Sequence, residues 1–131
     1  MTDIMFACVH NAGRSQMAAA FFNKHRTQDT VKGISAGTQP ASEVHDVVRE
    51  IMLEVGIDLS NITPKKLTPE LAETVSTIVT MGCGETCPFV PGVKMVDWSI
   101  TDPKNKPLQE AREIRDEIQD KIKTFIAENK Y

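Results

Sequence analysis

The sequence predicts an α/β protein, a three-layer sandwich built around a central four-stranded parallel sheet. Short apolar runs of strand length alternate along the chain with longer segments whose apolar residues recur at the helical period. The run at residues 76–81 (STIVTM) is apolar almost throughout, which is typical of a strand covered on both faces. In such sheets, functional sites form at the carboxyl ends of the strands.

The chain begins with a predicted strand at Ile4–Cys8, followed by a predicted helix from Arg14 to about His25. Apolar residues at helical spacing give that helix one face for the sheet. A second strand is predicted at residues 31–36, where Gly37 ends it. These elements place the residues between Cys8 and Arg14 at a turn from a strand into a helix.

A second helix is predicted at residues 44–55, with Ser42 as its N-cap and Gly56 as its C-terminal stop. Further along, Thr68 and Pro69 have the residue types favoured at the N-cap and at the first helical position. We therefore expect a short third helix to start there.

The last predicted strand, residues 93–97, follows the apolar run at 76–81. From Pro107 onward the chain predicts its longest helix. Apolar residues at helical spacing form one face of this helix: Leu108, Ala111, Ile114, Ile118, Ile122 and Phe125. No residue pattern in this helix indicates a catalytic or binding role, so we expect the helix to be part of the scaffold.

Composition narrows the possible classes of function. At 131 residues, we expect a single domain spanning 1–131, and a net charge of −3 without a basic cluster argues against nucleic-acid binding. No apolar run approaches the roughly 20 residues of a membrane span. The start MTDIMFACVHN has neither a basic flank nor a cleavage site, so we expect no signal peptide and a cytoplasmic location. We expect a monomer without a cofactor or a metal.

The segment CVHNAGRS, Cys8 to Ser15, has the features of an anion-binding loop. At the predicted helix start, free N–H groups and the positive end of the helix dipole face outward. The small residues Ala12 and Gly13 allow several N–H groups to converge on one point. Arg14 adds a planar fork of donors that matches a tetrahedral oxyanion.

Cys8 lies at the floor of this predicted loop, where the helix dipole and Arg14 both favour the thiolate. Ser15 can donate a hydrogen bond to that thiolate. A nucleophile within an anion-binding loop is suited to attack on a phosphate-like centre. The alternative is that Cys8 is an inert buried thiol, because CX5R also arises by chance.

Two further chemical segments also follow strand ends and should lie at the same edge of the sheet, residues 82–87 and 97–102. In the first, Cys83 and Cys87 lie four residues apart among glycines. Three cysteines in a cytosolic chain do not indicate structural disulfides. A redox pair that exchanges disulfides with a third thiol is the favoured interpretation, and zinc ligands or buried thiols are the alternatives.

Asp102 precedes Pro103 in the second segment. Its carboxylic acid could protonate an oxygen that leaves the anion, as a general acid. The alternative is a structural one, because an aspartate before a proline often caps a turn.

The motifs quoted above resemble those of a known family. CVHNAGRSQMA is similar to the anion loop of the low-molecular-weight tyrosine phosphatase superfamily, and specifically of its arsenate reductase branch. GISAG, EVGIDLSN, IVTMGCGETCP and DWSITDP recur in that branch in the same order, so the resemblance covers nearly the whole chain.

The resemblance implies a low-molecular-weight phosphatase-like fold and a role for each site residue. Cys8 would be the nucleophile, Arg14 the anion ligand, Asp102 the general acid, and Cys83 and Cys87 a disulfide relay. The remaining loop residues would bind the anion or shape the loop: Val9, His10, Asn11, Ala12, Gly13 and Ser15. Asn11 would hold the loop taut through backbone hydrogen bonds, and His10 would lie at its rim.

One subgroup of the branch also has a potassium site beside the loop. Where that subgroup has acidic residues, this chain has Ala19 and Lys65. We therefore expect no cation there, and the Lys65 ammonium could fill the space.

We expect this chain to reduce arsenate to arsenite in arsenic detoxification, with thioredoxin or another thiol donor as the reductant. A Cys8–arsenic adduct would form first, followed by a Cys8/Cys83/Cys87 disulfide relay. One rival is a low-molecular-weight protein tyrosine phosphatase, which needs only Cys8, Arg14 and Asp102. Others are a trithiol arsenite- or metal-binding protein, and an arsenate transferase that passes arsenic to a small thiol.

Overall fold

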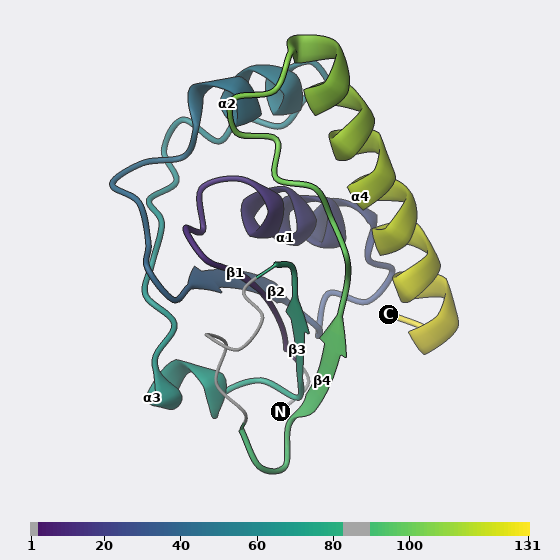
Figure 1. Ribbon diagram of the computed structural model, residues 1–131. Helices are drawn as coiled ribbons and strands as arrows, with labels where there is room; N and C mark the ends of the chain where they lie inside the picture. The colour runs from purple at the N-terminus through teal and green to yellow at the C-terminus, as the bar shows by residue number, and fades with distance from the viewer. Residues whose placement is uncertain (1–2, 83–89) are drawn as a thin grey trace.

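The computed structural model describes residues 3–82 and 90–131. Four parallel strands form one sheet in the order β2-β1-β3-β4 (Figure 1). Their bounds are Ile4–Cys8 for β1, Gly33–Gly37 for β2, Thr77–Thr80 for β3 and Lys94–Asp97 for β4. This sheet confirms the predicted fold class. The predicted redox pair, Cys83 and Cys87, lies outside the described residues.

Helices cover the sheet on both sides and complete the three layers (Figure 1). Apolar residues of α1 (Arg14–His25), α2 (Asp46–Leu53) and α4 (Leu108–Asn129) share one core with one face of the sheet. The short α3 (Pro69–Ala72) packs on the opposite face. In the described ranges, no helix is both long and apolar enough to cross a bilayer.

Strand β1 lies in the interior of the sheet and supplies both cores. Ile4 and Phe6 contribute to the core with α1 and α4, whereas Met5 and Ala7 contribute to the core beside α3. All four side chains are fully buried, which explains why the strand is apolar throughout instead of alternating. The last residue of β1 is Cys8, so the sheet itself positions the predicted nucleophile.

Most predicted element bounds agree with the structure to within two residues. The short helix α3 is confirmed in detail, because Thr68 Oγ1 accepts a hydrogen bond from Leu71 N at 3.1 Å and Pro69 is the first helical residue. The N-cap predicted for the second helix is wrong: α2 begins at Asp46, and His45 precedes it. The reason is that segment 38–45 uses its N–H groups to hold the loop after β1, so it cannot start a helix at Ser42.

Candidate active site

The loop between β1 and α1, residues 9–13, is held in place by hydrogen bonds that carbonyl groups of residues 8–12 accept from donors outside the loop. Asn11 O accepts a hydrogen bond from Gln16 Nε2 at 3.0 Å. The other carbonyl groups accept backbone N–H groups of segment 38–45: Cys8 from Thr38 (3.3 Å), Val9 from Gln39 (2.8 Å), His10 from Ala41 (2.9 Å) and Ala12 from His45 (2.9 Å).

This arrangement fixes where the N–H groups of the loop point. All described peptide bonds are trans, so each carbonyl group and the following N–H group point in opposite directions. With the carbonyl groups of residues 8–12 turned outward, the N–H groups of residues 9–13 face the inside of the loop. Convergent N–H groups of this kind form an anion-binding concavity.

Asn11 holds the loop in shape from the inside of the protein. It is fully buried and has a left-handed backbone (φ 50°), a conformation that asparagine tolerates better than most residues. Its Nδ2 donates to Ser15 Oγ at 2.7 Å, and its Oδ1 accepts from Lys65 N at 3.0 Å and from Gln16 Nε2 at 3.0 Å. Asn11 thus joins the loop to Ser15, Gln16 and Lys65, and none of these side-chain bonds is to backbone within the loop, where hydrogen bonds of Asn11 were expected.

Cys8 and Ser15 meet at the floor of the loop. The distance from Cys8 Sγ to Ser15 Oγ is 2.9 Å, and both residues are buried. Because Ser15 Oγ accepts from Asn11 Nδ2, its own hydrogen is free to point at the sulfur. A donated hydrogen bond of this kind stabilises a thiolate.

Arg14 connects the anion loop to the loop that follows β4. Its Nη1 donates to Ile100 O at 3.0 Å, and its Nη2 lies 3.6 Å from Asp102 Oδ2. Only 12% of the Arg14 side chain is exposed, against 40% for Asp102. The guanidinium is therefore fixed at the edge of the site, while the carboxylate lies at its open mouth.

The two carboxylate oxygens of Asp102 have different partners, and one of them makes the predicted turn cap. Its Oδ1 accepts the backbone N–H of Lys104 at 3.0 Å and so caps the turn around Pro103. Its Oδ2 faces Arg14. The turn cap and a chemical role are compatible because they use different oxygens.

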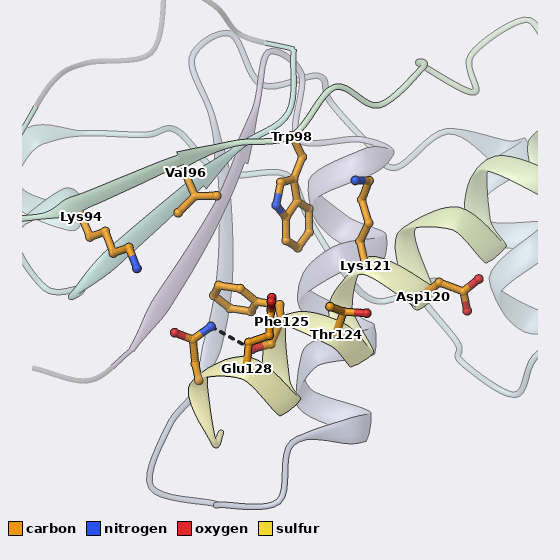
Figure 2. A pocket seen from close by; sticks show the side chains of 9 residues that line it. Lys94, Val96, Trp98, Asp120, Lys121, Thr124, Phe125 and Glu128 are labelled. Carbon is orange, nitrogen blue, oxygen red and sulfur yellow. Dashed lines mark hydrogen bonds between the residues drawn. The ribbon is translucent and has the colours of Figure 1, made fainter.

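Trp98 anchors the start of this acid loop, which we define as residues 99–106. Its backbone N–H donates to Thr80 O at 2.8 Å, and its ring meets Phe125 edge-on with 5.7 Å between ring centroids. Figure 2 shows the ring pointing toward α4, where a hollow of about 500 Å³ lies between β4 and that helix. Trp98 thus faces this hollow, which Cys8 does not line.

His10 lies at the rim of the anion loop, as expected. Its Nδ1 is 3.1 Å from Gln39 O, so this nitrogen is the donor in that contact. Val9, Ala12 and Gly13 contribute backbone groups, and no side-chain hydrogen bond is required of them. Cys8, Arg14, Ser15 and Asp102 therefore come together, whereas nothing is described for Cys83 and Cys87.

Several site residues were not found from the sequence. Gln16 is one, although it directly follows the motif. Gly37 is another, because a Cβ there would lie 2.6 Å from Val9 O and 2.9 Å from Asn11 N, so only glycine lets segment 38–45 pack against the loop. Gly37 was assigned only as a strand end. The contact that requires glycine is between two backbones and has no side-chain signature.

The predicted absence of a cation beside the loop rests on the residue types there. Both oxygens of Asn11 are engaged by N–H donors, and Ala19 and Lys65 provide no carboxylate. Among the described residues, no three His, Cys, Asp or Glu side chains are close enough to hold a metal ion.

The geometry of this site agrees with the proteins to which the chain is similar in sequence and structure. Residues 3–130 match the sequence profile described as "Low molecular weight phosphotyrosine protein phosphatase". A putative arsenate reductase of Halobacterium salinarum is 38% identical over 125 residues, covering 92% of this chain and 88% of the relative. A glutaredoxin arsenate reductase of Synechocystis is 31% identical over 130 residues, covering 97% and 98%.

A solved structure, the thioredoxin-dependent arsenate reductase of Corynebacterium glutamicum, has a TM-score of 0.82 and 38% identity. It covers 98% of this chain, which spans 61% of that longer one. The arsenate reductase of Archaeoglobus fulgidus gives a TM-score of 0.81 with 26% identity, covering 95% of this chain and 98% of that one. The sequence match over nearly the whole length, the parallel sheet and the anion loop at the end of β1 agree: the chain belongs to the low molecular weight phosphotyrosine protein phosphatase family.

Proposed function

We propose that this protein is an arsenate reductase. The observation that carries the proposal is the Cys8 sulfur, which lies at the floor of a loop with inward-facing N–H groups and within hydrogen-bond distance of Ser15. Such a site binds tetrahedral oxyanions and presents a nucleophile to their central atom. Relatives at 31–38% identity over most of their length are named as arsenate reductases, which favours arsenate among these anions.

In the first step, the Cys8 thiolate attacks arsenic(V) in the bound arsenate. A sulfur–arsenic bond forms, an arsenic–oxygen bond breaks, and the oxygen leaves as water after it accepts a proton from Asp102. The loop N–H groups and Arg14 stabilise the charge on the remaining oxygens. No electrons are transferred to arsenic in this step.

Reduction follows when the Cys83 thiolate attacks the sulfur of Cys8. A disulfide forms, and the electron pair of the sulfur–arsenic bond stays on arsenic, which leaves as arsenite. Cys87 then attacks Cys83 and frees the Cys8 thiolate. The Cys83–Cys87 disulfide is reduced by an external dithiol of the thioredoxin or glutaredoxin kind. The roles of Cys83 and Cys87 rest on the sequence.

This cycle needs no metal and no organic cofactor, because the protein thiols carry the two electrons. We propose that the enzyme works as a monomer in the cytoplasm, where thiol donors keep cysteines reduced. The net charge of −3 argues against nucleic acids and membrane surfaces as partners.

A tyrosine phosphatase is the second candidate, because the family profile bears that name and Cys8, Arg14 and Asp102 would suffice for it. One observation counts against it. The acid loop, residues 99–106, has no aromatic residue, and Trp98 at its start packs on Phe125 and Phe6 instead of facing the mouth. A phosphotyrosine ring would therefore find no stacking partner on this side of the site.

The test is turnover of arsenate with a thioredoxin system and, in parallel, with a glutaredoxin and glutathione system, followed through NADPH oxidation. Cys8→Ser is the control that must show no turnover. We expect arsenate-dependent oxidation with one of the two donors, and only slow hydrolysis of an aryl phosphate. Fast aryl phosphate hydrolysis without any arsenate-dependent oxidation would replace this proposal with the phosphatase. Arsenate turnover with glutathione alone that survives Cys83→Ser would replace the relay with adduct transfer.

A further inference from the structure

His45 lies where the anion loop, the acid loop and α2 meet. It directly precedes α2, and its backbone N–H donates to Ala12 O. A Cβ placed on Gly13 would lie 3.7 Å from His45 Cδ2 and 3.6 Å from Pro103 Cγ. The imidazole and the proline that follows Asp102 therefore pack around the same point of the anion loop.

Pro103 is the buried residue of the acid loop at this point, whereas Asp102 and Lys104 on either side are more exposed. The position of Asp102 thus depends on what Pro103 packs against. The ring of His45 and the side chain of Pro103 border the same site on Gly13, so the imidazole lies beside the Asp102–Pro103 turn.

Charged and titratable groups of the anion loop, the acid loop and α2 act on His45. Burial lowers the pKa of His45, and the negative charge of Asp102 acts in the opposite direction by raising it. The other groups are Lys104, which lowers this pKa, His10, which also lowers it, and Asp46, which raises it. Glu43 and Lys106 line a cavity of about 400 Å³ beside the ring. At neutral pH the imidazole is uncharged, and its protonated form has Asp102 as its main source of stabilisation.

We propose that His45 is a positioning residue for Asp102: the His45 ring holds the Asp102–Pro103 turn against the anion loop, and protonation of that ring lowers the fraction of Asp102 that carries a proton to donate. The second effect follows from reciprocity: a carboxylate that stabilises an imidazolium is itself stabilised as the carboxylate, so a smaller fraction of Asp102 carries the proton that it must donate. The inference rests on the acid role proposed for Asp102.

The coupling can be measured without activity. The ring protons of His45 are followed by NMR titration in the wild type, in Asp102→Asn and in the matched control Asp120→Asn on α4, with the signal assigned by its loss in His45→Gln. We expect Asp102→Asn to lower the His45 midpoint by about 0.2 to 0.7 pH units, the range for a partly exposed ion pair, and Asp120→Asn to leave it unchanged. Equal midpoints in all three proteins would refute the coupling.

Kinetics test the consequence for the reaction. The single-turnover loss of thiols with arsenate is measured from pH 5.5 to 8 in the wild type, His45→Phe, His45→Ala and the control His25→Asn. Phenylalanine keeps a ring without a charge, so we expect its rate at pH 8 to stay within about twofold of wild type. In the wild type we expect protonation of His45 to slow the reaction about two- to fivefold toward pH 5.5, and we expect His45→Phe to lack this slowing. Alanine removes the packing, and we expect about tenfold slower reaction at every pH, with phosphate still protecting Cys8 from alkylation.

The outcomes separate the effect of the His45 proton from the packing effect of the His45 ring. A His45→Phe variant that keeps the wild-type pH profile would refute the effect of the proton. A His45→Ala variant that loses phosphate protection as strongly as rate would show that His45 shapes only the anion loop. If wild-type protein loses no thiols with arsenate, the proposed function fails, and the NMR titration still decides whether His45 and Asp102 interact.

Discussion

Replacing Gly82 with alanine should damage the anion site through Arg14. Gly82 follows β3 with φ of 85°, and a Cβ there would lie 2.3 Å from Arg14 Nη1 and 3.0 Å from Arg14 Cζ. The guanidinium is the end of a flexible side chain, so the protein can fold if Arg14 swings away. It would then lose its hydrogen bond to Ile100 O.

Gly92 supplies a matched control, because it has the same φ of 85° with nothing within 4 Å of its Cβ position. A left-handed alanine costs roughly 1–2 kcal/mol at either position. Only Gly82→Ala should also displace Arg14. A hydrogen bond from a charged donor contributes about 1.5–3 kcal/mol, and 1.4 kcal/mol is a factor of ten in affinity. We therefore expect Gly82→Ala to bind phosphate about 10- to 100-fold more weakly, while Gly92→Ala binds it like wild type.

The assay is protection of Cys8 against iodoacetamide by increasing phosphate, which gives an apparent dissociation constant for each variant. Urea unfolding checks that both alanine variants lose similar stability. Wild-type phosphate affinity in Gly82→Ala, together with a clear loss in Arg14→Ala, would refute the reasoning, because Arg14 would then have kept its position despite the added methyl group.

Three further predictions concern other parts of the site. Asp102→Asn keeps the oxygen that caps the turn at Lys104, so we expect phosphate protection within a few fold of wild type but a first step slower by about 10² to 10⁴ in single-turnover measurements; an unchanged rate would leave Asp102 as a turn cap only. Cys87→Ser should complete one turnover and stop with a Cys8–Cys83 disulfide, seen by peptide mass mapping, whereas Cys83→Ser should reduce no arsenate. Asn11→Ala should lower the free energy of unfolding by about 2–4 kcal/mol in urea titration, because it leaves buried partners unsatisfied and places alanine in a left-handed conformation; a loss below about 1 kcal/mol would contradict this account.

The sequence was sufficient to predict the parts of the site that side chains carry. Cys8 at the end of a strand, Arg14 at the start of a helix and Ser15 beside the sulfur were all expected, because a strand-to-helix turn and a CX5R spacing are local features. The family resemblance predicts that Asn11 braces the loop through backbone hydrogen bonds; in the structure its side chain contacts Ser15 Oγ, Gln16 Nε2 and the backbone of Lys65.

What the sequence did not reveal is carried by the backbone or by distant partners. Segment 38–45 holds the loop through peptide N–H groups, which any residue except proline can supply, so Ser42 was wrongly assigned as a helix cap. Gly37 and Gly82 are required by contacts with residues far away in the chain. Arg115 was missed for the same reason: it is 8% exposed within the apolar face of α4 because its Nη1 donates to Ile51 O at 2.9 Å and to Glu54 Oε1 at 2.8 Å.

The contacts of Arg14 suggest how binding and acid catalysis are linked. Its guanidinium is held from one side by Ile100 O and Asp102, which belong to the same loop. When an oxyanion enters the anion loop, it competes with Asp102 for the donors of Arg14, because these donors suit both oxyanions. The incoming negative charge also disfavours a second negative charge at Asp102 and so favours its protonated form. Anion binding would therefore convert Asp102 from an ion-pair partner of Arg14 into a proton donor, while Ile100 keeps the arginine in place.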